Sequence, residues 1–305
     1  MGTAHGTRAV DLRTEVTIMT GWFPFALAAL LLMGMQRFFY KVAAERSCDT
    51  AVTTLSFMAT VTVISAVVFF LRDASLPDLS FLLLVGLANS LAFLLATVTH
   101  IEALKKLPAR IAYPLIRLDA VLVVVISFLF FQEQVSGRQE IGIALALAAV
   151  LLIARERAGS GDAVRKSAAG FLFVAAAILA GAAAAISSRF AALGTDKIAF
   201  MAVSYGLSTL FVAGFGERGR RQEKAVAGSR ESLSIGFLMG ILNVVGYYAY
   251  LEALSRGPLS LVTVITSMHF VIAVVLSIFI YHERPTLLGI SGIVLTVVSL
   301  VLLRG

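Results

Sequence analysis

The chain has 305 residues, of which 59% are hydrophobic and only 14% are charged. This composition leaves too little polar surface to cover a soluble globule, so it excludes a water-soluble enzyme and predicts a protein that is solvated mainly by lipid. The net charge of +7 comes mostly from Lys and Arg between apolar segments, where they meet lipid headgroups and set topology, and it does not indicate nucleic-acid binding.

Ten apolar segments are separated by short polar stretches, and most are close to the length that crosses a hydrocarbon core roughly 30 Å thick. In chain order they cover residues 22–40, 50–71, 80–104, 111–131, 139–154, 168–190, 197–215, 233–254, 259–281 and 286–303. Residues 1–20 form a polar N-terminal tail without the features of a cleaved signal peptide. The fifth segment is the weakest, because Arg138 and Glu140 shorten its apolar run to about 14 residues. The sequence therefore predicts an all-α integral membrane protein without a soluble domain.

Residues 86–152 align without a gap with residues 236–302, at a constant offset of 150. Apolar sequence matches itself by chance, but an ordered series of identical polar and turn residues does not. The identical positions include Glu102 and Glu252, Pro108 and Pro258, Ser127 and Ser277, Glu133 and Glu283, and Gly142 and Gly292. We infer a duplication with a first five-helix repeat at 21–154, a basic connecting loop at 155–167 and a second five-helix repeat at 168–305.

Five helices per repeat is an odd number, so the second repeat enters the membrane from the opposite face. Such inverted-topology repeats place substrate near the midplane, between halves that rock for alternating access. The sequence has no glycine-rich phosphate loop, aspartate-rich motif or nucleophile elbow, its one cysteine is Cys48, and its four histidines lack metal-ligand spacing. The prediction is a transporter with a central cavity and with no catalytic residue, metal or cofactor.

Charged residues within the segments are few, and each costs on the order of 2.5–3.5 kcal/mol at the bilayer centre. Gln36 and Arg37 lie late in the first segment, and Arg189 lies late in the sixth, at a corresponding position. Two interpretations remain open for the arginines. They snorkel to the interface, or their guanidinium groups bind a carboxylate or phosphate of the substrate.

The fourth segment carries Arg117 and Asp119, and the repeat places Ser267 and His269 at the same offsets in the ninth. Residues two apart on a helix point about 200° apart, so Arg117 and Asp119 do not face the same wall. One alternative is a structural ion pair with a neighbouring helix. The other assigns Arg117 to an anionic group of the substrate and Asp119 to an amine or a proton, with His269 as a titratable group.

Uncharged polar residues occur in the third segment, as Asn89 and His100, and in the eighth, as Asn243 and Tyr247. Tyr247 follows Asn243 by four residues and therefore shares its helix face, although a tyrosine in a membrane helix is more often a packing or interfacial residue. We predict that Asn89, Asn243 and Tyr247 line the cavity. The four repeated glutamates lie at segment ends, where charge pairing explains them.

The series Glu102-Ala103-Leu104, Pro108 and Phe131-Gln132-Glu133-Gln134 returns as Glu252-Ala253-Leu254, Pro258 and Tyr281-His282-Glu283-Arg284. This doubled pattern, which covers nearly the whole chain, resembles the EamA branch of the drug/metabolite transporter superfamily. The resemblance implies ten transmembrane helices in two inverted five-helix repeats and a central cavity lined by helices one, three, four, six, eight and nine. It also implies export or exchange of small metabolites.

Two features depart from this pattern. Lys and Arg are more numerous on the side of the loops at 155–167 and 216–232, which predicts termini outside the cell, whereas the resemblance implies cytoplasmic termini. The related small multidrug exporters use a glutamate in their first helix for proton exchange, but residues 22–40 contain no acidic residue. That mechanism is therefore not transferred to this chain.

The sequence predicts a multi-pass cell-membrane transporter for a small polar metabolite, such as an amino acid or organic acid with an anionic group. Asp119 and His269 are the candidates for coupling to a proton, and the expected partners are the substrate and the lipid bilayer. One alternative is efflux of hydrophobic or cationic compounds, with Asp119 central. The other is a membrane enzyme or a partner subunit that does not transport.

Overall fold

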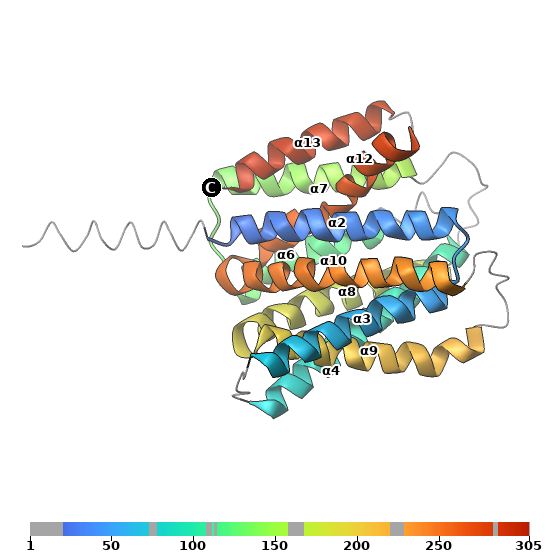
Figure 1. Ribbon diagram of the computed structural model, residues 1–305. Coiled ribbons are helices and arrows are strands. Elements are labelled where there is room, and N and C mark those ends of the chain that lie inside the picture. Colours follow the sequence, from blue (N-terminus) through green and yellow to red (C-terminus); the bar gives the residue numbers. More distant parts are fainter. Residues whose placement is uncertain are drawn as a thin grey trace, which may run out of the picture.

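The computed structural model describes residues 21–72, 78–107, 112, 115–157, 168–219, 229–282 and 286–304, and the regular structure in these ranges is helical. The helices lie side by side in one bundle (Figure 1). Their bounds are α2 Phe23–Glu45, α3 Thr50–Leu71, α4 Leu79–Lys106, α6 Leu118–Phe130, α7 Gly137–Arg157, α8 Ala168–Gly194, α9 Lys197–Gly219, α10 Ser229–Arg256, α11 Leu259–Ser267, α12 His269–Tyr281 and α13 Leu287–Leu303.

Seven helical stretches among the described residues are long and apolar enough to cross a membrane. One of these seven, Leu259–Tyr281, joins α11 and α12, while α6 and α13 are shorter apolar helices. The seven stretches are Phe23–Ala43, Thr50–Leu71, Leu79–His100, Ala168–Gly194, Lys197–Gly214, Arg230–Arg256 and Leu259–Tyr281. The prediction of an all-α protein that crosses the membrane several times is thus confirmed.

Two segments that were predicted as single helices are interrupted, at corresponding places in the two repeats. Arg117 precedes α6 with φ −68° and ψ −7°, and Met268 separates α11 from α12 with φ −79° and ψ 2°. A ψ near zero departs from the α-helical value of about −42°. Short i→i−3 bonds close both turns, from Ala120 N–H to the Arg117 carbonyl and from Val271 N–H to the Met268 carbonyl. Each break begins a new helix in the interior of the bundle.

Helices of one repeat pack against helices of the other. Gly86 of α4 lies against Val203 of α9, and Gly236 of α10 lies against Thr53 of α3. The sequence offset of 150 relates both members of the first contact to both members of the second. The glycines matter because an added Cβ would lie 2.7 Å from Val203 or 2.4 Å from the Thr53 carbonyl oxygen. The duplication thus extends to the contacts between helices.

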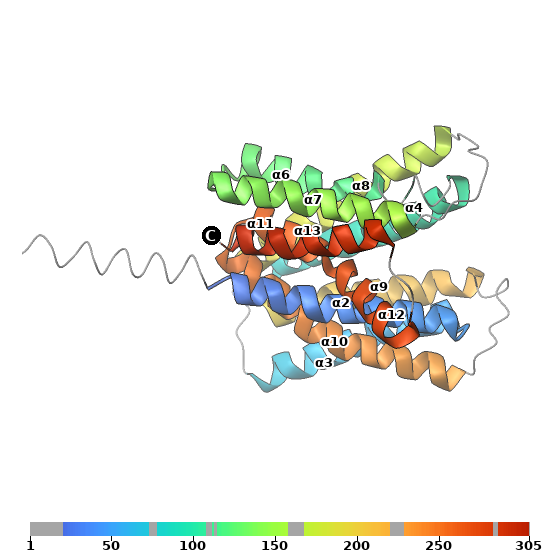
Figure 2. The ribbon, with the colours of Figure 1, turned by 90° about the horizontal axis from the view of Figure 1, so that it is seen from above.

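The direction of the helices follows from these contacts. α2 runs antiparallel to α10, since Trp22 lies against Gly257 and Arg46 reaches Glu231. The equivalent pair, α4 and α8, is also antiparallel, with Phe81 against Gly194. α7 and α13, the last helices of the two repeats, lie side by side in both views (Figure 1 and Figure 2).

The helix ends that flank the two basic connections lie at one end of the bundle. α7 and α9 end, and α8 and α10 begin, at the end opposite the C-terminus (Figure 1). The two predicted basic loops, 155–167 and 216–232, connect these helices, so their flanking helix ends lie on one side, as the sequence predicted. The C-terminal end of α10 and the start of α11 lie at the other end, which we call the terminal end.

Candidate functional site

The break before α6 places two charged side chains within electrostatic range of side chains on α2 and α4. Arg117 and Asp119 come from the start of α6, Arg37 comes from α2, and His100 comes from α4. Both arginines are close enough to act electrostatically on Asp119 and on His100. Broken helices at corresponding positions of two repeats are the usual site of substrate binding in transporters built from such repeats. We call Arg37, His100, Arg117 and Asp119 the charged cluster.

Arg117 and Asp119 face different neighbours, as their spacing predicted. The Arg117 guanidinium lies 6.0 Å from the centre of the Phe270 ring on α12, within the range of a cation–π contact. Asp119 lies against Gly181 of α8, where an added Cβ would come 2.9 Å from Oδ2. Glycine at 181 therefore provides the space that the carboxylate occupies. The two side chains thus link the start of α6 to α12 and to α8.

His269 opens α12 directly after the second break. Its Nδ1 lies 2.6 Å from the carbonyl oxygen of Thr266, and its side chain is buried. A continuous helix would offer that carbonyl to the backbone N–H of Phe270, so this contact is consistent with the break. The backbone here lies close to α2, because an added Cβ on Gly34 would be 2.6 Å from the His269 carbonyl oxygen. The equivalent residues Asp119 and His269 thus pack on equivalent helices, α8 and α2.

A buried amide pair links α2 to α10 near the middle of both helices. Nδ2 of Asn243 donates a hydrogen bond of 2.9 Å to Oε1 of Gln36, and the two residues are 3% and 5% exposed. Tyr247, one turn later, packs edge-on against Tyr205 and stacks with Tyr250, with ring centres 5.7 Å apart in both cases. Tyr205 was not predicted. Tyr247, which was predicted to line the cavity, thus lies among other aromatic rings.

Asn89 is the centre of a separate polar network. Its Nδ2 lies within hydrogen-bond distance of the Ala184 carbonyl and of the Ser187 and Ser188 hydroxyls, and its Oδ1 accepts from the Ser204 hydroxyl at 2.8 Å. The Ser188 hydroxyl also lies 2.9 Å from the Tyr247 hydroxyl. Because protein groups use both ends of the Asn89 amide, this residue ties α4 to α8 and α9 in the present conformation.

The structure does not bring Arg37 and Arg189 together. Arg37 is exposed and lies 5.5 Å from the centre of the Tyr40 ring. Arg189 instead donates from Nη1 to the Gly257 carbonyl, at 2.7 Å, at the terminal end. Antiparallel directions for α2 and α8 account for this separation, since equivalent residues then lie toward opposite ends. The two arginines therefore belong to different parts of the molecule.

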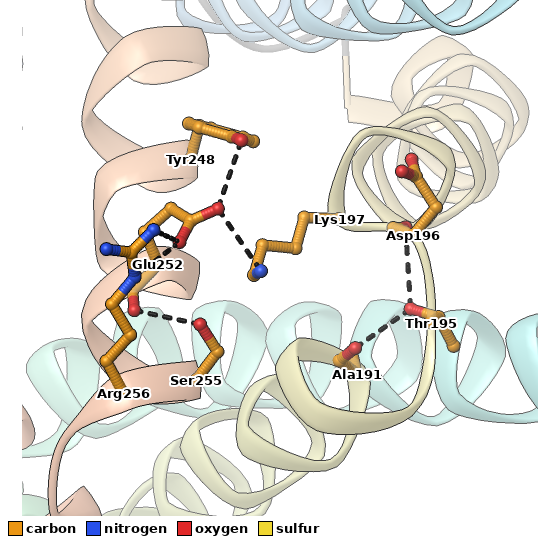
Figure 3. A network of polar contacts seen from close by, with 8 residues as sticks. All are labelled: Ala191, Thr195, Asp196, Lys197, Tyr248, Glu252, Ser255 and Arg256. Carbon is orange, nitrogen blue, oxygen red and sulfur yellow. Dashed lines mark hydrogen bonds and ion pairs between the residues drawn. The ribbon is translucent and has the colours of Figure 1, made fainter. Parts of the chain in front are cut away.

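A polar network at the terminal end was only partly expected (Figure 3). The predicted pairing of Glu252 with Arg256 is present, with Oε2 2.9 Å from Nη2. Oε1 of Glu252 also lies 3.2 Å from Lys197 Nζ and accepts a hydrogen bond of 3.0 Å from the Tyr248 hydroxyl. Lys197 comes from the start of α9, and no local pattern in the sequence links it to Glu252. This network fastens the end of α10 to α9.

No group of three or more His, Cys, Asp or Glu side chains within the described ranges is placed to hold a metal ion. Glu133 instead contacts the start of α11, where Leu259 N–H, Ser260 N–H and the Ser260 hydroxyl all donate to its carboxylate. Its repeat partner Glu283, together with Pro108, lies outside the described residues. The Glu133 carboxylate thus bonds to a helix start of the protein itself.

Comparison with known proteins gives one family and one fold. The model of the EamA-like transporter family matches the chain twice, at residues 20–155 and 168–305. A solved crystal structure superimposes on 93% of this chain and 96% of its own, with a TM-score of 0.71 and 18% sequence identity. At that identity the likeness shows the fold alone. None of the curated proteins matches the chain.

Proposed function

Since the chain belongs to the EamA-like transporter family, we propose that it carries a small polar metabolite with an anionic group across a cell membrane by alternating access. It is a multi-pass membrane transporter by family and by its apolar helices. The finer proposal has ten membrane crossings in two inverted repeats. The antiparallel pairs α2 with α10 and α4 with α8 support this topology. Each pair joins the first helix of one repeat to the third helix of the other, and these two helices would run parallel if both repeats entered the membrane from the same face.

The charged cluster is the observation that carries the proposal. Its two arginines and one aspartate give it a net positive charge, and it lies where α6 begins. A guanidinium group matches a carboxylate or phosphate in bidentate geometry. We therefore assign the anionic group of the substrate to Arg117, with Arg37 on the approach from the exposed side. Asp119 and His269 remain the candidates for proton coupling.

Uptake into proteoliposomes tests the role of Arg117. Arg117→Ala should reduce uptake of the anionic substrate at least tenfold, since a charge-assisted hydrogen bond contributes roughly 1.5–3 kcal/mol. Arg230→Ala, at an exposed position at the start of α10, removes the same charge away from the cluster and should leave uptake unchanged. A thermal-shift screen of amino acids, organic acids and sugar phosphates supplies the ligand. Unchanged uptake of every anion by folded Arg117→Ala protein would contradict the assignment.

A second candidate function is efflux of cationic or hydrophobic compounds. It is favoured by the aromatic rings of Tyr205, Tyr247 and Tyr250, since Tyr250 is close enough to Asp119 for an electrostatic interaction. Aromatic faces beside a carboxylate suit a cation. Competition of transport by cations but not by anions would support this function, and the reverse result would support the first.

A further inference from the structure

Glu133 of the first repeat binds the beginning of a helix that belongs to the second. Its carboxylate accepts hydrogen bonds from Leu259 N–H, from Ser260 N–H at 3.0 Å and from the Ser260 hydroxyl at 2.6 Å. These hydrogen bonds cap the first turn of α11. The N-cap residue of α11, Pro258, makes no side-chain cap bond itself. The free N–H groups at a helix start favour a negative charge. A residue from the opposite repeat thus supplies the cap that α11 lacks.

The chain around Glu133 is shaped to present this carboxylate. Gln132 has a left-handed backbone with φ 49°, and Glu133 N–H bonds back to the Ser127 carbonyl at 3.3 Å. The same left-handed conformation occurs at His282, with φ 54°, at the equivalent position in the second repeat. Non-glycine residues seldom adopt it, because Cβ is crowded there. The turn ends α6 abruptly and directs Glu133 sideways rather than along the helix.

α11 connects this cap to the interior site. Every residue from Leu259 to Thr266 is buried, and the helix ends at Met268, directly before His269. Directly before the start of α11, the Gly257 carbonyl accepts a hydrogen bond from Arg189, and Trp22 packs on Gly257. A shift of α11 relative to the first repeat would therefore break these contacts at the terminal end and move the helix break at Met268 at the same time.

We propose that Glu133 is a positioning residue for transport, which holds α11 against the first repeat and keeps the terminal end closed until the repeats rock. This inference rests on the proposed function, because only a transporter needs this end to open. The carboxylate contacts backbone N–H groups whose positions change when α11 moves. Its three hydrogen bonds belong to one conformation, and their loss favours the other.

Accessibility of a thiol on α11 tests the proposal. In a Cys48→Ser background, Thr263→Cys places a single thiol on the buried face of α11, where Thr263 is 8% exposed. Oriented proteoliposomes receive a membrane-impermeant maleimide on one face or the other. Glu133→Gln keeps the side-chain shape and removes the charge, and it should raise labelling from the terminal end about tenfold, the size of effect expected for a lost charged cap. Glu140→Gln, exposed on α7, is the matched control and should change nothing.

Three results decide between the alternatives. Faster labelling of Glu133→Gln from the terminal end, with slower labelling from the other face, supports the proposal. Unchanged labelling in protein with a normal melting midpoint overturns it, as does a lower midpoint with equally faster labelling from both faces, which indicates a purely structural cap. If Glu133→Gln does not fold, Ser260→Ala takes its place in the experiment. Ser260→Ala removes one of the three hydrogen bonds and should give a smaller shift in labelling in the same direction. Failure of the wild type to transport any metabolite would overturn the proposed function instead.

Discussion

The two ends of the bundle hold α10 in different ways. At the terminal end, Glu252 lies 3.2 Å from Lys197 and 2.9 Å from Arg256, and its side chain is 10% exposed. At the opposite end, Arg46 lies 2.6 Å from Glu231, but these side chains are 59% and 40% exposed. The shorter contact is the weaker one, because water screens exposed charges and competes for their hydrogen bonds. Burial rather than distance therefore decides which end is fastened.

The two ends of the bundle also differ in how many buried contacts hold them together in this conformation. The terminal end combines the Glu252 network with the Glu133 cap and with Trp22, which is 3% exposed. In the half of α2 that leads to the opposite end, Arg37 and Tyr40 are exposed. Transport by alternating access requires the two ends to exchange these states, so contacts at the terminal end should contribute to stability and contacts at the opposite end should not. Three substitutions test this contrast.

The largest effect is expected for Gly257→Ala at the terminal end. An added Cβ would lie 2.4 Å from Cγ of Trp22, which is buried and has no room to move. Overpacking of this kind costs about 1–3 kcal/mol, so the melting midpoint in detergent should fall clearly. Gly137→Ala is the control, since nothing lies within 4 Å of a Cβ there. Equal midpoints for the two variants would show that this end is not tightly packed.

A smaller effect is expected for Glu252→Gln, which removes the carboxylate shared by Lys197 and Arg256. Arg256 is about half exposed and stays hydrated, whereas Lys197 is 21% exposed and loses its nearest negative charge. We expect a loss of about 2 kcal/mol, measured by thermal unfolding. Glu231→Gln makes the same chemical change at the opposite end. If Glu231→Gln were the more destabilising variant, the assignment of the fastened end would be wrong.

The smallest effect is expected for Arg46→Met at the opposite end. Its ion pair with Glu231 is exposed, so the melting midpoint should stay within the error of the measurement, at low and at moderate salt. Lys197→Met is the matched change at the terminal end and should lower the midpoint. A clear, salt-dependent loss of stability in Arg46→Met would contradict the contrast and would indicate that both ends are held.

The sequence predicted the helices well and their interruptions not at all. Hydrophobic runs identify where a chain is solvated by lipid, but α11 and α12 form one uninterrupted run at 259–281 with neither glycine nor proline near Met268. Pro114, shortly before Arg117, was the one local signal for the break in the fourth segment. At the second break, contacts with other helices decide the backbone, including the close approach of α2 at Gly34.

The structure brings some of the predicted site residues close together and places others apart. Arg117 and Asp119 lie within electrostatic range of Arg37 and His100, and Gln36 meets Asn243. Arg189 lies elsewhere, because repeat symmetry relates positions without bringing them together. Helix periodicity states which residues share a face, but it does not state which neighbour that face meets. Lys197 was missed for this reason, since its partner Glu252 lies on another helix.

By itself, the sequence determined the solvent, the approximate helices, the duplication and the family, since each follows from composition, apolar length or an ordered set of identities. Only the tertiary structure decided that Glu133 caps a helix of the other repeat, that two predicted helices are interrupted and that Lys197 pairs with Glu252. These features depend on groups that are distant in the chain. Their energies come from burial and from hydrogen bonds across the bundle, which local sequence does not encode.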